Sequence, residues 1–168
     1  MGWPLFLRLI LGMVSGLALL TPGLPAADLT WVGPSNGDWF VAGHWSGSGD
    51  HPRAGDQVRI TNGWVLLTNT TEEMAAFSIT NATLTFSNTA TALRAVDVTL
   101  WNNGRMTHAP IDTNAAPGIT NRVALAVSNM TLFTGSRIDV SARGFRGGVG
   151  AMIGQGPGRG TYASGHGG

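Results

Sequence analysis

The chain has 168 residues, of which 43% are apolar and 11% charged, so it can bury a core for one domain but carries little surface charge. It has no cysteine, and all ten of its basic residues are arginine, which excludes disulfides, thiolate metal sites and mechanisms that need a lysine. A net charge of +1 gives no electrostatic reason to expect a nucleic-acid partner.

Residues 1–27 have the layout of a secretory signal peptide. Arg8 precedes twelve uncharged residues (9–20, LILGMVSGLALL), and prolines and small residues then lead to Asp28. A spanning helix needs roughly 20 apolar residues, so we expect a cleavable signal, cut after Ala26 or Ala27, and no membrane span in the mature chain. A cysteine-free exported protein fits a bacterial envelope, so we predict secretion, with the protein at the cell surface or associated with the outer membrane.

Residues 28–57 combine tryptophans with glycines and turn formers. Trp31, Trp39 and Trp45 recur at intervals of eight and six, which are too irregular for one helix face. We predict short strands and tight turns whose indoles form a cap over one end of the following structure. The alternative for these three side chains is an exposed face on which sugar rings stack.

Residues 58–142 contain a weak repeat that is marked by asparagine. The segments VRITN, FSITN, VTLWN and LAVSN each place apolar residues four and two positions before the asparagine, which predicts a half-buried strand in each unit. An asparagine at such a corner accepts a left-handed turn and can hydrogen-bond along a stack. The four corner residues are Asn62, Asn81, Asn102 and Asn129.

The spacings between these asparagines, 19, 21 and 27 residues, are typical of solenoid coils with loop insertions. Second strands are expected at 64–67, 83–86 and 131–133, with a weaker one near Gly104 and Arg105, and a last strand at 138–140. We therefore predict an all-β fold, a parallel β-helix, with an antiparallel β-sandwich as the alternative.

Residues 143–168 change composition abruptly, because eleven of these 26 residues are glycine. Such a segment cannot close a hydrophobic core, and it contains no polar capping unit of the kind that solenoids use. We therefore expect the chain to be the front part of a longer protein.

Two blocks resemble a known group of proteins. WVGPSNGDWFVAGHWSGSGDHPRAGDQVRI resembles the tryptophan-glycine segment that opens many secreted bacterial repeat proteins, and NRVALAVSNMTLFTGSRIDVSARGFRGG with GPGRG and GHGG resembles their glycine-rich stretches. These are large exported, autotransporter-like or LamG-associated proteins of planctomycete and verrucomicrobial type. The resemblance implies a right-handed β-helix in an extracellular protein. The chain departs from the pattern at His44, Ala142 and Phe145.

The candidate chemistry is sparse. Five residues between 38 and 56 could supply nitrogen and oxygen ligands to a metal, but without fixed spacing, so we expect turn residues rather than a metal site. No carboxylate pair for acid–base work on sugars can be assembled, because Asp97, Asp112 and Asp139 share no offset in the repeat. We predict no catalytic residue and no cofactor. The five candidate ligands are Asp38, His44, Asp50, His51 and Asp56.

Trp101 is the best candidate for binding a partner, because it follows inward-facing Leu100 and should point outward, where its indole could stack on a sugar. Extracellular polysaccharide or cell-surface components are the partners that we expect. The sequence thus predicts a non-enzymatic extracellular scaffold, the N-terminal part of a larger exported protein. The alternative is a glycan-binding module or the start of a polysaccharide-degrading β-helix.

Overall fold

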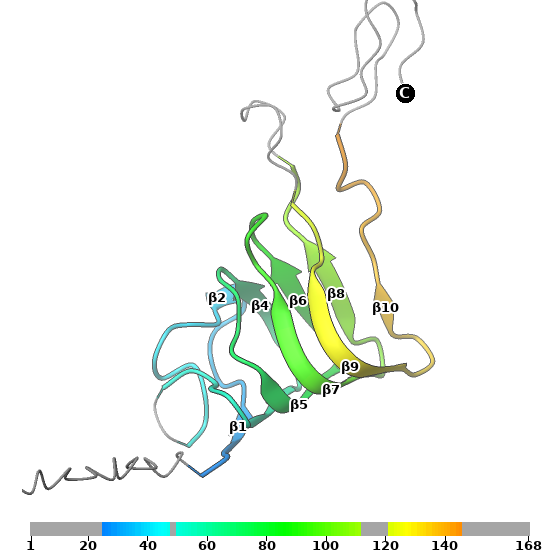
Figure 1. The fold of residues 1–168 in the computed structure, drawn as a ribbon. Coiled ribbons are helices and arrows are strands. Elements are labelled where there is room, and N and C mark those ends of the chain that lie inside the picture. The colour runs from blue at the N-terminus through cyan, green and yellow to red at the C-terminus, as the bar shows by residue number, and fades with distance from the viewer. Residues whose placement is uncertain (1–24, 48–49, 112–120, 146–168) are drawn as a thin grey trace, which may run out of the picture.

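The computed structural model describes residues 25–47, 50–111 and 121–145, and these ranges contain ten strands and no helix (Figure 1). No helix in these ranges could cross a membrane. The strands are β1 (Asp28–Thr30), β2 (Gly37–Asp38), β3 (Gln57–Ile60), β4 (Gly63–Leu67), β5 (Met74–Thr80), β6 (Ala82–Phe86), β7 (Leu93–Trp101), β8 (Arg105–His108), β9 (Leu125–Leu132) and β10 (Arg137–Ile138).

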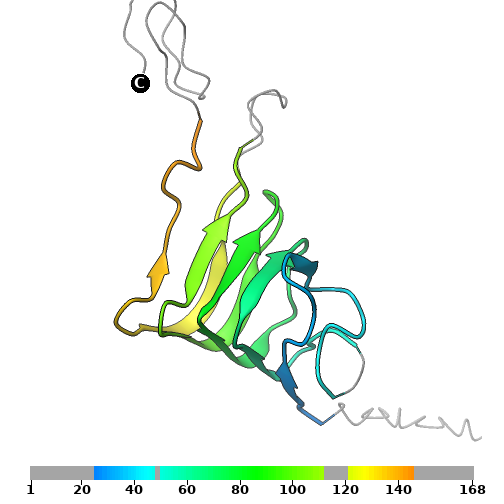
Figure 2. The ribbon, with the colours of Figure 1, turned by 180° about the vertical axis from the view of Figure 1, so that it is seen from behind.

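The strands form two parallel five-stranded sheets. The first sheet has the order β1-β3-β5-β7-β9 and the second has the order β10-β8-β6-β4-β2, so odd and even strands separate into different layers. Figures 1 and 2 show these layers from opposite sides. Every ladder between these strands is parallel. The all-β class is confirmed, and the antiparallel sandwich is wrong, because its hairpins would pair consecutive strands with each other.

Period-two alternation places the apolar side chains between the sheets. Ile60, Ile79 and Leu100 stand in register on neighbouring strands of the first sheet and are almost fully buried. Each inward side chain therefore packs on the equivalent side chains of the strands beside it. The buried core comprises Leu29, Trp31, Trp39, Trp45, Val58, Ile60, Val65, Leu67, Met74, Phe77, Ile79, Ala82, Leu84, Phe86, Leu93, Ala95, Val98, Leu100 and Met106.

Short turns carry the chain from the first sheet to the second. Asn81 and Asn102 lie in these turns with φ of 49° and 40°, and the backbone N–H of Asn81 donates to the carbonyl oxygen of Asn102 at 3.0 Å. At the corresponding corner, Gly63, the first residue of β4, has a φ of 76°, and Asn62 stands directly before it. Asparagine and glycine tolerate this left-handed backbone better than other residues, which explains Asn81, Asn102 and Gly63 at this corner. Asn62 does not have a positive φ, so the left-handed turn predicted at this residue falls on Gly63 instead.

The strands β7 and β9 change their side-chain alternation midway. Val96 and Asp97 are both exposed although they are consecutive, so the inward positions resume at Val98. In β9, Asn129 pairs with Asp97 and its Nδ2 donates to Asp97 Oδ1 at 2.8 Å. Asn129 thus lies inside a strand that runs without a break to Leu132, and the turn predicted at this residue is wrong.

The cause of this error is that the same pattern occurs twice in each long strand. In β7, two apolar residues precede Asp97 by four and two positions, and two others precede Asn102 in the same way. The asparagine-marked repeat makes Asn129 the equivalent of Asn102, whereas the ladder pairs it with Asp97. Because Leu100 pairs with Leu132, the position equivalent to Asn102 is Thr134, followed by Gly135 with a φ of 82°.

Candidate functional site

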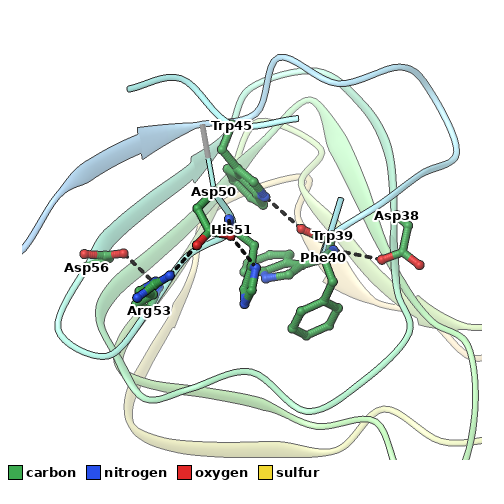
Figure 3. Close-up of polar contacts among 8 residues, drawn as sticks. All are labelled: Asp38, Trp39, Phe40, Trp45, Asp50, His51, Arg53 and Asp56. Atoms are coloured by element: carbon green, nitrogen blue, oxygen red, sulfur yellow. Dashed lines mark hydrogen bonds and ion pairs between the residues drawn. The ribbon is translucent and has the colours of Figure 1, made fainter. Parts of the chain in front are cut away.

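The three N-terminal tryptophans form a compact cluster at the β1 and β2 end of the sheets. Trp45 lies edge-on to both Trp31 and Trp39, with ring centroids 5.1 Å and 4.7 Å away, and Trp39 also contacts Phe77 in β5. The indole N–H of Trp45 donates to the carbonyl oxygen of Trp39 at 2.8 Å (Figure 3). All three side chains are at most 3% exposed. They cannot offer a ring face to a sugar, so the stacking alternative is wrong for them.

Two glycines give this cluster the space that it needs. A Cβ on Gly33 would lie 2.7 Å from atoms of both Trp31 and His44, and a Cβ on Gly37 would lie 2.8 Å from the ring of Trp31. Such distances are below any tolerable carbon–carbon contact, so a side chain at either position would displace the indole. The glycine two residues after Trp31 is therefore required by the packing of the cap.

The cap also covers the outer edge of β1. The backbone N–H of Ser46 donates to the carbonyl oxygen of Thr30, and the Ser46 hydroxyl accepts from the Thr30 N–H, both at 2.9 Å. The N–H groups of Val32 and Gly33 both donate to the carbonyl oxygen of His44. These bonds occupy backbone groups that an edge strand would otherwise present to another strand.

Asp38 and His44 serve the local structure of the cap. Asp38 Oδ1 accepts the backbone N–H of Phe40 at 2.8 Å and the hydroxyl of Thr68 at 3.0 Å, while the Nδ1 of His44 lies 2.9 Å from the carbonyl oxygen of Asp38. The His44 ring also packs edge-on against Trp31. Both residues are therefore committed to holding the turn after β2.

Asp50, His51 and Arg53 form a partly exposed polar group on the following loop (Figure 3). Asp50 forms an ion pair with Arg53 and accepts from the backbone N–H of His51, and its carboxylate lies 2.9 Å from His51 Nδ1. The hydrogen bond from Arg53 and then that from the His51 backbone lower the pKa of Asp50 below its usual value. This carboxylate is thus engaged in an ion pair with Arg53, three residues later in the same loop, and is not a free ligand.

Asp56 is the buried member of the predicted set, with 6% of its surface exposed. Its two carboxylate oxygens accept backbone N–H groups from Ala27 and Arg53, each at 2.8 Å. Within the described ranges, no three His, Asp or Glu side chains converge in a way that could hold a metal ion. The five candidate ligands are thus distributed among separate structural contacts.

Trp101 lies on the outer face of the first sheet and is 40% exposed. Its ring stacks on Phe133, with centroids 3.7 Å apart and planes only 8° from parallel. The register pairs Leu100 with Leu132, so the next residues, Trp101 at the end of β7 and Phe133 directly after β9, lie side by side. Phe133 is itself 41% exposed. One face of the indole is therefore covered by Phe133, a neighbour that is 32 positions away in the sequence and could not be identified without the strand register.

The remaining acidic candidates do not converge. Asp97 accepts from Asn129, and Asp139 pairs with Arg105 at 3.1 Å and Arg137 at 3.5 Å. Hydrogen bonds from Ser141, its backbone N–H first, lower the pKa of Asp139. Asp112 lies outside the described residues, as do the signal segment before residue 25 and the glycine-rich stretch after residue 145.

No protein family, no curated protein and no solved structure matches this chain.

Proposed function

We propose that the chain is the first part of a right-handed parallel β-solenoid that acts as a non-enzymatic, adhesin-like scaffold outside a bacterial cell. The order of the strands supports a solenoid, because each passage from an odd to an even strand adds one strand to each of the two sheets. The resemblance of the tryptophan-glycine block to exported, autotransporter-like repeat proteins supports the extracellular location.

The observation that carries this proposal is the difference between the two ends of the sheets. At the β1 end, buried indoles and backbone hydrogen bonds close the edge. At the β9 end, Leu132 is 45% exposed, whereas Leu100, its partner in the ladder, is fully buried. A module that is closed at one end and has an apolar strand at the other suits a scaffold that begins here and joins further β-structure through β9.

Display of a reporter on intact cells tests the scaffold function. A reporter protein that follows Gly168 should reach the cell exterior and be cleaved by protease added to intact bacteria, because a scaffold presents whatever follows it. The Ile79→Asp variant should lose this display, since it places a charge in the core, whereas Trp101→Ala should retain it. A reporter that stays protected inside intact cells would contradict the proposal.

A second function, glycan binding, is supported by exposed aromatic side chains. Trp64 is 58% exposed on β4, and the stacked pair of Trp101 and Phe133 is 40% and 41% exposed on the other sheet. Flat apolar rings of this kind can stack on sugars. Gel electrophoresis through soluble polysaccharides discriminates the two functions, because a glycan-binding module should be retarded and its Phe133→Ala variant should not, whereas a scaffold alone migrates freely.

A further inference from the structure

Ala27 is the residue at which the chain joins the folded body. Its backbone N–H donates to Asp56 Oδ1 at 2.8 Å, its carbonyl oxygen accepts from the backbone N–H of Gln57 at 2.8 Å, and its side chain packs against the core. Pro25 and Ala26, directly before it, are exposed. The boundary between exposed and anchored backbone therefore falls at the Ala26–Ala27 peptide bond.

The acceptor on the other side of this contact is a buried carboxylate. Asp56 is 6% exposed, and its second oxygen accepts the backbone N–H of Arg53. The guanidinium of Arg53 is engaged by Asp50, and no basic side chain in the described ranges lies within ion-pair distance of Asp56. A buried carboxylate destabilises the fold unless a cation lies beside it, so a positive charge close to Oδ1 of Asp56 would stabilise the folded protein.

We propose that a signal peptidase hydrolyses the Ala26–Ala27 bond and that the new ammonium group of Ala27 is the counter-ion of Asp56. Water is the co-reactant: its oxygen joins the carbonyl carbon of Ala26, which leaves as a carboxylate, and its protons pass to the nitrogen of Ala27. The inference rests on the proposed export of the chain. The mature N-terminus would then have a structural role, because cleavage turns the neutral N–H donor at the nitrogen of Ala27 into a charged ammonium donor to Asp56.

The same contacts argue against the other candidate bond, Ala27–Asp28. Cleavage there would remove the N–H that Asp56 Oδ1 accepts and the carbonyl oxygen to which Gln57 donates. The buried carboxylate would keep a single donor, and a buried polar group without its partner destabilises the fold. Small residues precede both bonds, so the sequence alone does not separate them, whereas the hydrogen bonds favour the first.

The intact mass of the exported protein tests the cleavage site. The full chain, expressed with its own leader, should yield a product that spans residues 27–168. An exported product that begins at Asp28 would overturn this inference and leave the proposed export standing. A chain that keeps its leader and remains in the cell would overturn both.

Amine labelling of that product tests the ion pair. The chain contains no lysine, so an amine-reactive ester modifies only the N-terminal amine. The native product should react about tenfold more slowly than the Asp56→Asn variant. The reason is that an adjacent carboxylate raises the pKa of the amine by about one unit, which leaves less of the reactive neutral amine. The Asp28→Asn variant, which removes an exposed carboxylate on the next residue, should react like the native product.

The parent protein unfolded in concentrated urea supplies a reference that does not depend on the folding of any variant. Equal labelling rates for the native and the urea-unfolded parent would overturn the ion pair. A native rate that is at least several-fold lower, with Asp56→Asn restoring the faster rate, would support it.

Discussion

Replacement of Ile79 by aspartate tests the register of the two sheets. Ile79 lies in β5 with none of its surface exposed, between Ile60 and Leu100 in the ladder. Removal of a buried isoleucine side chain down to Cβ costs about 2–5 kcal/mol. A buried carboxylate without a partner adds several kcal/mol, so the sum reaches the roughly 5–15 kcal/mol by which a domain of this size is stable. We therefore expect Ile79→Asp to be unfolded at room temperature.

Urea titration followed by far-UV circular dichroism provides the measurement, with two matched variants. Thr80→Asp introduces the same charge one residue later on the outer face of β5, where it should change the unfolding free energy by less than about 1 kcal/mol. Ile79→Val removes one methylene and should cost about 0.5–1.5 kcal/mol. If Ile79→Asp unfolded at the same urea concentration as the parent, or if Thr80→Asp were as damaging, the inward assignment of Ile79 would be refuted.

Three further variants test separate contacts. Gly104→Ala should cost about 1–3 kcal/mol in the same titration, because its Cβ would lie 2.6 Å from the carbonyl oxygen of Ile79 in β5, whereas Gly144→Ala, with open space around it, should cost nothing measurable. Asp50→Asn should destabilise the protein at neutral pH only, because the hydrogen bond from Arg53 lowers the pKa of Asp50 in the folded state. The stabilisation by the Asp50 carboxylate is present above its unfolded pKa of about 4 and is lost as the pH falls through the lower folded pKa. The urea midpoints of the variant and the parent should therefore converge in acid. Trp101→Ala should unfold cooperatively and lose about 1–2 kcal/mol, from its stacked contact and part of its buried area.

The inward positions of the sheets could be predicted from the sequence because they depend on local alternation. The residue types around each asparagine predict that Val58, Phe77 and Val98 point inward, and all three are at most 1% exposed. Period two is a property of the extended backbone itself, so a few consecutive residues are enough to reveal it.

The strand β8 was only weakly visible for the opposite reason. Its residues Arg105, Met106, Thr107 and His108 do not alternate between apolar and polar, yet the last three are buried. Their conformation follows from the ladder with β6, which pairs Thr83 with Arg105 and continues from there. A strand whose position is imposed by its neighbour leaves little signal in its own composition.

The contacts of the candidate site could not be predicted, because they join residues that are distant in the sequence. The glycine beside Asp56 predicts a turn residue, but the hydrogen bond of Asp56 to Ala27 spans 29 positions. The stacking of Trp101 on Phe133 likewise depends on the register of β7 with β9. Prediction of either contact would need the strand pairing to be known first.

The change of alternation in β7 and β9 connects the fold to the surface that the protein presents. Two consecutive outward residues put Asp97 and Asn129 beside each other on the outside, where the amide donates to the carboxylate, and they return Val98 and Met130 to the inward side. A strict period of two would have turned Asp97 inward, and a buried carboxylate there would have no partner. The irregularity therefore lets β7 keep both of its apolar halves in the core, and it places a hydrogen-bonded polar pair, Asp97 and Asn129, on the outer face.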